Sequence, residues 1–384
     1  MRRRLFATAH QAYRASVRVL LEQEVVPHFA QWDQDGSTPR ELFTKLGALG
    51  ALGFGVPDRF GGTGITDFRY NTVLSEEAAR LAVAPAVLGP SRQADICVPY
   101  LLDLADDEQK ARWLPGITSG RLVTTAATTE PGTDSEPPGI RVTALRGGDH
   151  YVLDGHTTFF SDGSNPDLVI VPVRTGEHPH HGISLIVVER DTPGLARGRR
   201  MKKAGPHDRD SVVLSFTAAR VPAANLLGGE GEGLRGLTRN LARERLSGAV
   251  AAIAQTAAAL RWTIDYVRQR HAFGNPVGTL QHTLLTLSEL ATEIDITQAY
   301  VDLCVLALNA RELDPADAAK ARWWSTELQG RVMETCVRLH GGPDYLTEYC
   351  IARAWLDSRA SRICAGTTEI MKQIIGRSLH LGAS

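Results

Sequence analysis

The sequence predicts an α+β protein in which a helical domain is followed by a small β domain and then by a helical bundle. Three observations predict this order. Apolar residues recur at helical spacing over the first 122 residues, short β-branched runs bounded by turn residues follow, and long apolar seams return near residue 234. We therefore expect an N-terminal helical domain at 1–122, a middle β domain at 123–228 and a C-terminal bundle at 229–384.

Length and composition exclude several classes of protein. The 384 residues are 43% hydrophobic and 22% charged, with a net charge of −1, so the chain lacks the basic field that nucleic-acid binding requires. No apolar run approaches the roughly twenty residues of a membrane span. The basic start at 1–4 resembles a signal peptide, but the apolar run after it ends too early. The five cysteines form no CxxC pair, so we expect no disulfide framework and a cytoplasmic location.

The N-terminal region is expected to form helices separated by glycine-rich breaks. Residues 17–26 carry apolar positions at helical spacing, and Pro27 ends that helix. Glycine-rich breaks follow over 47–64. Helical patterning returns at 71–81 and 97–114.

The middle region is expected to contain at least three strands. The runs at 167–173, 183–188 and 211–216 are short, rich in valine and isoleucine, and bounded by Gly, Pro, Asn and Asp. This pattern is typical of strands joined by turns.

Two local motifs in this region suggest ligands but favour a structural interpretation. The glycine cluster at 228–233 has the spacing GxGxG after GG instead of GxGxxG, and no βαβ unit surrounds it, so we expect a flexible connector. His178, His180 and His181 lie in a Gly/Pro-rich turn with no suitably spaced carboxylate beyond Glu177. We expect a solvated hairpin tip there instead of a metal site.

The C-terminal region is expected to consist of long packed helices. A third helix should begin at Asp314-Pro315, an N-cap followed by a first-turn proline, and end at Gly341-Gly342. The two helices before it carry seams of apolar residues at spacings of three and four. These seams are Leu246, Val250, Ile253, Ala257, Leu260, Ile264 and Val267, then Leu280, Leu284, Leu287, Ala291 and Ile294.

Three separated stretches carry residues with possible chemistry. The first is Thr128-Thr-Glu-Pro-Gly-Thr-Asp-Ser135 followed by 153–163, the second is Arg268-Gln-Arg-His-Ala-Phe-Gly274 with Gln281, and the third is His340-Gly-Gly342 with 365–369. Together, and in this order over essentially the whole chain, they resemble the acyl-CoA dehydrogenase family. The resemblance implies a helical domain, a β-barrel-like middle domain and a C-terminal four-helix bundle.

The resemblance also implies FAD bound between the β domain, the bundle and a neighbouring subunit of a homotetramer or homodimer. Thr129 would hydrogen-bond the flavin ring, and Phe159 and Ser161 would stack on it and bond its edge. Arg270 would meet the pyrophosphate, since a guanidinium fork suits two phosphates. The remaining cofactor positions are Phe273, Gln281, Gly342, Thr367 and Glu369. Structural alternatives are core roles for Phe159 and Phe273 and a surface ion pair for Arg270.

The family's reaction needs a carboxylate that removes the α-proton of an acyl thioester, held dry so that its pKa rises. Most members carry this glutamate directly before the Gly-Thr of the last motif, where this sequence has Ala365. A branch that includes isovaleryl- and long-chain acyl-CoA dehydrogenases places it on the first long bundle helix, where Glu244 stands. Gly248, one turn later, leaves room beside it. Glu244 could otherwise be a solvated side chain on an arginine-rich face, between Arg243 and Arg245.

Other positions match or depart from the family pattern. Arg245 matches a residue that lines the mouth towards coenzyme A, and Ser135 matches a serine on the substrate side. Arg338 replaces a glutamine that touches FAD, and Thr157 replaces a frequent lysine. Asp134 replaces a glycine, and Pro343-Asp344 replaces another common pair.

The resemblance implies FAD-dependent α,β-dehydrogenation of a saturated acyl-CoA to the trans-2-enoyl thioester, with electrons passed to an electron-transfer flavoprotein. A close variant would act on an acyl-carrier-protein thioester. A flavin-dependent monooxygenase of the same fold is a second alternative, although such relatives lose the catalytic glutamate. A third is a non-catalytic partner subunit of a heteromeric dehydrogenase, which the altered cofactor positions would permit.

Overall fold

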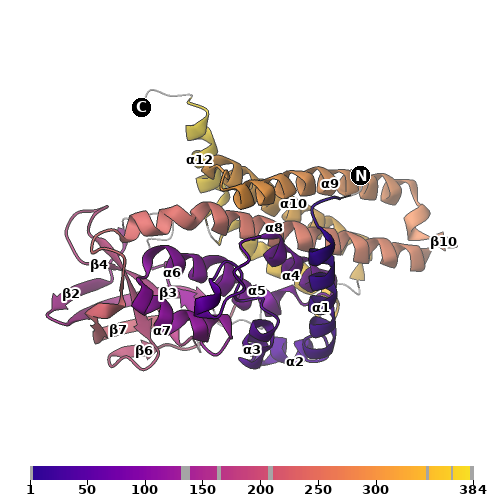
Figure 1. Cartoon of the computed structure of the whole chain (residues 1–384). Coiled ribbons are helices and arrows are strands. Elements are labelled where there is room, and N and C mark those ends of the chain that lie inside the picture. The colour runs from indigo at the N-terminus through magenta and orange to yellow at the C-terminus, as the bar shows by residue number, and fades with distance from the viewer. Residues whose placement is uncertain are drawn as a thin grey trace.

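The computed structural model describes residues 3–130, 139–161, 166–205, 211–342, 346–364 and 366–380. N-terminal helices and a β-sheet lie side by side along a long helical bundle (Figure 1). One helix of the bundle, α8 (Gly233–Gln269), runs past both of them. This arrangement confirms the predicted order of helices, β domain and bundle.

Seven α-helices make up the described N-terminal part of the chain. Their apolar faces form one core from α1 through α5, in which Val17, Leu21, Val73 and Ala78 are buried. The Asp106 side chain accepts a hydrogen bond from the Gln109 backbone and caps the last helix, so the helix expected over 97–114 is interrupted there. The helices are α1 (Thr8–Glu24), α2 (Phe29–Asp35), α3 (Glu41–Ala48), α4 (Arg69–Arg80), α5 (Ala84–Arg92), α6 (Val98–Leu104) and α7 (Asp107–Thr118).

The middle of the chain forms a sheet with the strand order β6-β7-β3-β2-β4-β5-β8, and β1 also pairs with β4. The three expected strands are present as β4, β5 and β7. The long hairpin of β2 and β3 was not predicted. The strands are β1 (Thr124–Ala126), β2 (Thr143–Gly147), β3 (His150–Ser161), β4 (Leu168–Arg174), β5 (Ile183–Glu189), β6 (Leu195–Arg197), β7 (Ser211–Pro222) and β8 (Leu226–Leu227).

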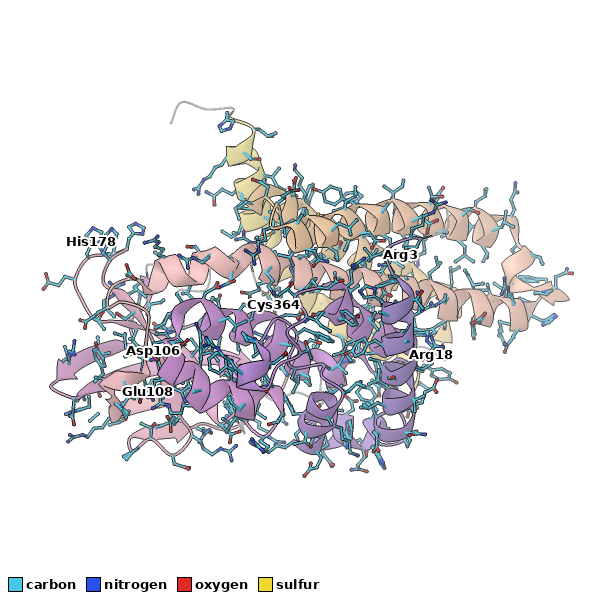
Figure 2. All side chains as sticks on the ribbon, in the orientation of Figure 1. Arg3, Arg18, Asp106, Glu108, His178 and Cys364 are labelled. Atoms are coloured by element: carbon cyan, nitrogen blue, oxygen red, sulfur yellow. The ribbon has the colours of Figure 1, made fainter. Side chains whose placement is uncertain are left out.

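Strands β4 and β5 are apolar along their length because both of their faces are covered. Leu168 and Ile170 belong to the core that α6 and α7 form on one face, whereas Val169 and Val171 point into the core of the β domain. The sequence of a strand that is buried on both faces is a continuous apolar run, and β4 and β5 have this pattern. The turn between them, with His178, is exposed as expected (Figure 2).

Helix α8 forms the predicted bundle with α9 (Gln281–Ala310), α10 (Pro315–His340) and α12 (Thr368–Ser378), and α10 packs against the other three. The predicted seam of α8 is confirmed, since Leu246, Val250 and Ile253 are buried. The predicted seam of α9 is only partly correct, because Leu280 and Leu284 are exposed in the single chain. The shorter helix α11 is Cys350–Ser358, and the hairpin before α9 consists of β9 (His271–Ala272) and β10 (Asn275–Pro276).

The glycine cluster before α8 packs against the sheet and is therefore not a free connector. A Cβ at Gly233 would lie 2.7 Å from the Ser184 backbone, and one at Gly231 would lie 2.4 Å from the His181 carbonyl oxygen. The Gly231 amide donates to the Ser184 hydroxyl at 2.9 Å. Glycine is needed here because the entrance of α8 is pressed onto β5, and this contact sets the position of α8 relative to the sheet.

None of the described helices is both long enough and apolar enough to cross a membrane.

Candidate active site

Glu244 lies on α8 opposite a π-helical turn, Gln93–Cys97, that joins α5 to α6. Its side chain is partly buried. Among the described residues, no hydrogen bond or ion pair to its carboxylate is found. π-Helical turns occur often at functional sites, since they redirect side chains within a helix. The carboxylate of Glu244 is therefore held by α8 without a direct partner from the described chain.

The environment of Glu244 combines burial with positive charge. Burial raises the pKa of the Glu244 carboxyl, and the nearby guanidinium groups of Arg92, Arg322 and Arg245 oppose this rise without cancelling it. Burial raises the pKa of the Tyr100 phenol on α6, and the nearby charge of Glu244 raises it further. A carboxylate with a raised pKa is suited to accept a proton from a weak carbon acid. The partial burial of Glu244 is less than expected for a core residue and more than expected for the alternative of a fully solvated glutamate.

A second carboxylate, Asp95, lies in the π-helical turn and is buried. It accepts hydrogen bonds from the Asn71 amide and the Ser247 hydroxyl, and Arg243 lies close enough to favour its charged form. Burial nevertheless raises the pKa of Asp95. Its bond to Ser247 fastens the turn to α8. Because both of its oxygens already accept hydrogen bonds, Asp95 is less available as a base than Glu244.

Arg322 of α10 is a buried arginine in close contact with α8. It is 5% exposed, and its Nη2 donates to the carbonyl oxygens of Ser361 at 2.8 Å and Cys364 at 2.7 Å. A Cβ at Gly248 would lie 2.1 Å from Nη1, so the guanidinium rests directly on the backbone of α8. The room that Gly248 leaves beside Glu244 is therefore occupied by Arg322.

Part of the predicted cofactor set lies in the β domain. Thr129 follows β1 and is partly buried, and its carbonyl oxygen accepts the Thr158 amide at 2.9 Å. This bond ties Thr129 to β3, whose backbone also carries Phe159 and Ser161. The side chains of Phe159 and Ser161, like the whole of Ser135 and Asp134, lie outside the described part of the structure. Thr157 is fully buried in β3.

Another part lies at the far end of the bundle. Arg270 ends α8, Phe273 occupies the tip of the β9–β10 hairpin, and Gln281 begins α9. Phe273 is 93% exposed and has a φ of +52°. Figure 1 places this hairpin at the opposite end of the molecule from the sheet. A single chain therefore does not bring these three residues together with Thr129.

The remaining predicted residues lie at the ends of α10 and α12. Gly342 follows α10, whose last carbonyl, that of His340, accepts the Tyr266 hydroxyl at 2.8 Å near the end of α8. Thr367 caps α12, with its hydroxyl 3.5 Å from the Ile370 amide. Hydrogen bonds from its own backbone amide and from the Thr367 side chain lower the pKa of Glu369 in the first turn. Arg338 is exposed on α10. Ala365 and the pair 343–344 lie outside the described residues.

Arg92, Arg322 and Asp95 were not predicted from the sequence. One feature of the sequence could have indicated Arg322. It falls on a face of α10 whose other side chains are small and buried, with Ala318 and Ser325 one turn away on either side. A charged residue at such a position needs a partner or a function. Arg92 and Asp95 belong to a helix break whose geometry no local pattern indicates.

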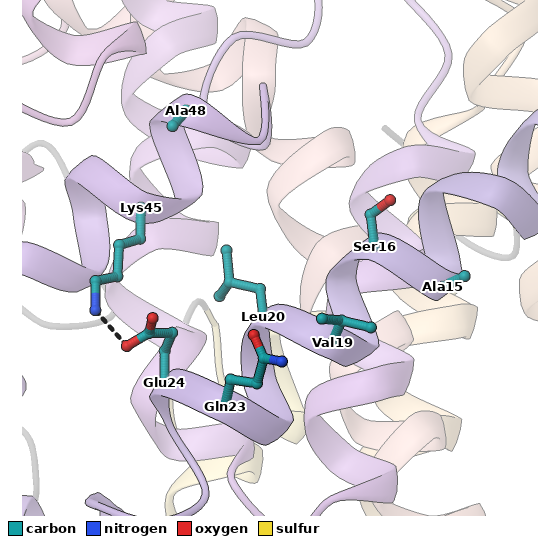
Figure 3. A pocket seen from close by; sticks show the side chains of 8 residues that line it. All are labelled: Ala15, Ser16, Val19, Leu20, Gln23, Glu24, Lys45 and Ala48. Carbon is teal, nitrogen blue, oxygen red and sulfur yellow. Dashed lines mark hydrogen bonds and ion pairs between the residues drawn. The ribbon is translucent and has the colours of Figure 1, made fainter.

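A hollow in the described part of the structure lies away from Glu244 and carries no catalytic group. It has a volume of about 570 Å³ and lies between α1 and α3, with Leu20 and Val19 in its wall (Figure 3). Its two charged residues, Glu24 and Lys45, form an ion pair with each other. The hollow is a groove of the N-terminal helices, separate from Glu244.

Comparison with known proteins covers almost the whole chain. Residues 7–121, 125–219 and 231–380 match the family descriptions "Acyl-CoA dehydrogenase, N-terminal domain", "middle domain" and "C-terminal domain". The long-chain specific acyl-CoA dehydrogenase of Sus scrofa mitochondria is 38% identical over 98% of this chain and 88% of its own length. An acyl-CoA dehydrogenase of Bacillus subtilis is 30% identical over 95% of this chain and 96% of its own. The crystal structure of an acyl-CoA dehydrogenase from Geobacillus kaustophilus is 40% identical and superimposes with a TM-score of 0.95, covering 98% of this chain and 100% of the other.

Proposed function

Since the chain belongs to the acyl-CoA dehydrogenase family of oxidoreductases, we propose that it converts a saturated acyl-CoA into the trans-2-enoyl thioester, with Glu244 as the base that removes the α-proton. The observation that carries this proposal is the position of Glu244, a carboxyl with a raised pKa and no hydrogen-bond partner among the described residues. Arg245, which is buried next to it, would line the approach of the coenzyme A arm, together with Ser135.

Glu244 is suited to the proton-transfer step by its charge balance. The free carboxylate accepts the α-proton and becomes neutral, so its burial favours the product of this step. The charges of Arg92, Arg322 and Arg245 favour the ionised form of Glu244, but burial outweighs them and its pKa remains raised. Exclusion of water by the bound substrate would raise the basicity of the carboxylate further.

The residues present fit FAD as the cofactor. Among the described residues the Arg270 guanidinium has no hydrogen-bond or ion-pair partner, and a Cβ at Gly342 would meet no atom within 4 Å. A free guanidinium suits a pyrophosphate, and open space at a glycine suits close approach of a ligand. When bound, FAD supplies the acceptor for the β-hydride. We propose that its holders are Thr129, Phe159, Ser161, Arg270, Phe273, Gln281, Gly342, Thr367 and Glu369, and that an electron-transfer flavoprotein receives the electrons.

We further propose that the FAD site is completed by a second copy of the chain in a homotetramer or homodimer. Thr129 follows β1 of the sheet and Phe273 belongs to the β9–β10 hairpin, and the sheet and the hairpin lie at opposite ends of one chain, so we expect one cofactor not to reach both within it (Figure 1). Helix α9 also leaves a row of apolar side chains exposed, which is unusual for a monomer. The row consists of Leu284, Leu285, Ile296, Leu303 and Leu306.

The assembly can be tested by placing a charge on this row. Leu303→Arg is expected to reduce the assembled protein to the mass of one chain in light scattering after size exclusion, because an unpaired guanidinium would be buried in the interface. FAD content per chain is expected to fall with it. Leu145→Arg, at an exposed leucine of β2, is the matched control and should change neither quantity. Full assembly of the Leu303→Arg variant would contradict the proposal for α9.

Anaerobic mixing of the FAD-loaded protein with a panel of saturated acyl-CoAs tests the proposed reaction. Bleaching of the oxidised flavin absorbance, with formation of the 2-enoyl-CoA, is the expected result for at least one chain length. If only an acyl-carrier-protein thioester bleaches the flavin, the substrate is carried by acyl carrier protein and not by coenzyme A. A protein that takes up FAD and is bleached by neither kind of thioester would show that the proposed reaction is wrong.

A further inference from the structure

We propose that Arg322 is a positioning residue for the α-proton transfer: seated on Gly248, it holds the loop before Ala365 against α10 and places its positive charge on α8 one turn from Glu244. The inference rests on the proposed role of Glu244 as the base. It assigns a role to a residue pair, Gly248 and Arg322, that none of the sequence motifs includes.

The position of Arg322 follows from the geometry of α8. Glu244 and Gly248 are four residues apart, so they lie one above the other on the same face of the helix. Because Gly248 has no side chain, the Arg322 guanidinium reaches the helix surface one turn beyond Glu244. No ion pair within 4.0 Å joins Glu244 to Arg322, so the interaction acts across a gap. The arginine therefore influences the charge of the base without occupying its oxygens.

The hydrogen bonds of Arg322 leave part of the guanidinium unused. Nη2 serves the carbonyl oxygens of Ser361 and Cys364, whereas Nε is buried and has no partner among the described residues. If Arg322 only held the loop of Ser361 and Cys364, its guanidinium would not also need to contact α8. Two bonds to the loop fix the direction of the guanidinium, and its remaining edge lies over Gly248. The arrangement fixes a positive charge on the surface of α8 one turn from the base.

The other groups around Glu244 come from four elements. Arg92 faces it from the end of α5, Tyr100 from α6 and Arg245 from α8 itself. Arg322 faces it from α10, and Cys364 lies close to Arg322 on the loop. Tyr100 stays neutral, since burial raises the pKa of its phenol. Removing Arg322 leaves Arg92 and Arg245 in place, so the expected change is partial.

The test is the pH dependence of single-turnover flavin bleaching by an acyl-CoA that the wild-type protein accepts. The base acts as the carboxylate, so the rate is lost as the pH falls through the pKa of Glu244. Arg322→Gln is expected to raise the midpoint of this acid limb by about one pH unit, because an opposite charge no longer favours the ionised form. Arg322→Lys keeps the charge and should leave the midpoint near the wild-type value.

Three further variants separate this role from a purely structural one. Gly248→Ala pushes the guanidinium off α8 and should raise the midpoint in the same direction, so the proposal stays testable if Arg322→Gln fails to fold. Gly376→Ala, on α12 with no atom within 4 Å of the new Cβ, and Arg331→Gln, on the exposed face of α10, are the matched controls. Both should leave the midpoint unchanged. Loss of thermal stability in Arg322→Gln and Arg322→Lys alike, with neither midpoint moved and Gly248→Ala also unchanged, would overturn the proposal.

The same experiment distinguishes failure of this inference from failure of the proposed function. If Glu244→Gln still bleaches at the wild-type rate, Glu244 is not the base and the premise is wrong. If Glu244→Gln is inactive while the Arg322→Gln and Gly248→Ala midpoints stay at the wild-type pH, the base is correct and the role given to Arg322 is wrong.

Discussion

Glu244→Gln is expected to slow acyl-CoA-driven flavin bleaching by about 10³-fold, because the amide keeps the shape of the side chain but cannot accept a proton. Ala365, at the position where most of the family carries its base, offers no replacement. Stopped-flow absorbance under anaerobic conditions measures the rate directly. The matched control is Glu289→Gln, at an exposed glutamate of α9, which should bleach at the wild-type rate.

A shortened carboxylate gives the intermediate case. Glu244→Asp retains a base but withdraws it by one methylene, and a displacement of this size in the reacting geometry costs about 10²-fold in rate. Flavin content and thermal unfolding should stay close to wild type in both variants, because Glu244 makes no hydrogen bond to a described residue. Wild-type bleaching by Glu244→Gln would contradict the assignment of the base.

The helices and three of the strands could be predicted because their burial is regular. The seam through Leu246, Val250 and Ile253 repeats every three or four residues, and α8 buries it along its length. The hairpin of β2 and β3 could not be predicted in this way. Gly155 interrupts β3 next to an irregularity in the β3–β7 register, and several of its positions are polar, so neither alternation nor a continuous apolar run marks it.

The candidate site could be predicted only in part for a similar reason. Glu244 lies within a helical pattern, so its face relative to Gly248 follows from spacing alone. The convergence of Arg92 and Arg322 on that face depends on how α5 and α10 pack against α8, and no periodicity within either helix contains this information. The separation of Thr129 from Phe273 likewise follows from the length of α8 in three dimensions.

Glu77→Ala is expected to lower the free energy of unfolding by about 3 kcal/mol, since removing one partner of a buried ion pair leaves uncompensated charge behind. Glu77 lies on α4 with its side chain 2% exposed. Its oxygens accept hydrogen bonds from Arg14 and Arg18 of α1, each at 2.8 Å, and from Arg80 at 3.1 Å. Figure 2 shows Arg18 on α1. One carboxylate thus joins the first helix to the helix that packs on α8.

Urea denaturation followed by circular dichroism at a constant FAD concentration measures this loss. Glu22→Ala is the control, because Glu22 pairs with the same Arg80 at 3.5 Å but is half exposed, and such surface pairs contribute less than about 1 kcal/mol.

The pH dependence of the stability gives a second check. Burial would raise the pKa of Glu77, but hydrogen bonds from Arg18 and Arg14 outweigh it and lower the pKa below its usual 4.5. The stabilisation is therefore complete above that pH and is lost as the pH falls through the lowered pKa, so the difference between wild type and Glu77→Ala should shrink in acid. A difference that stayed constant from neutral pH into acid would show that Glu77 stabilises the chain by packing and not by its charge.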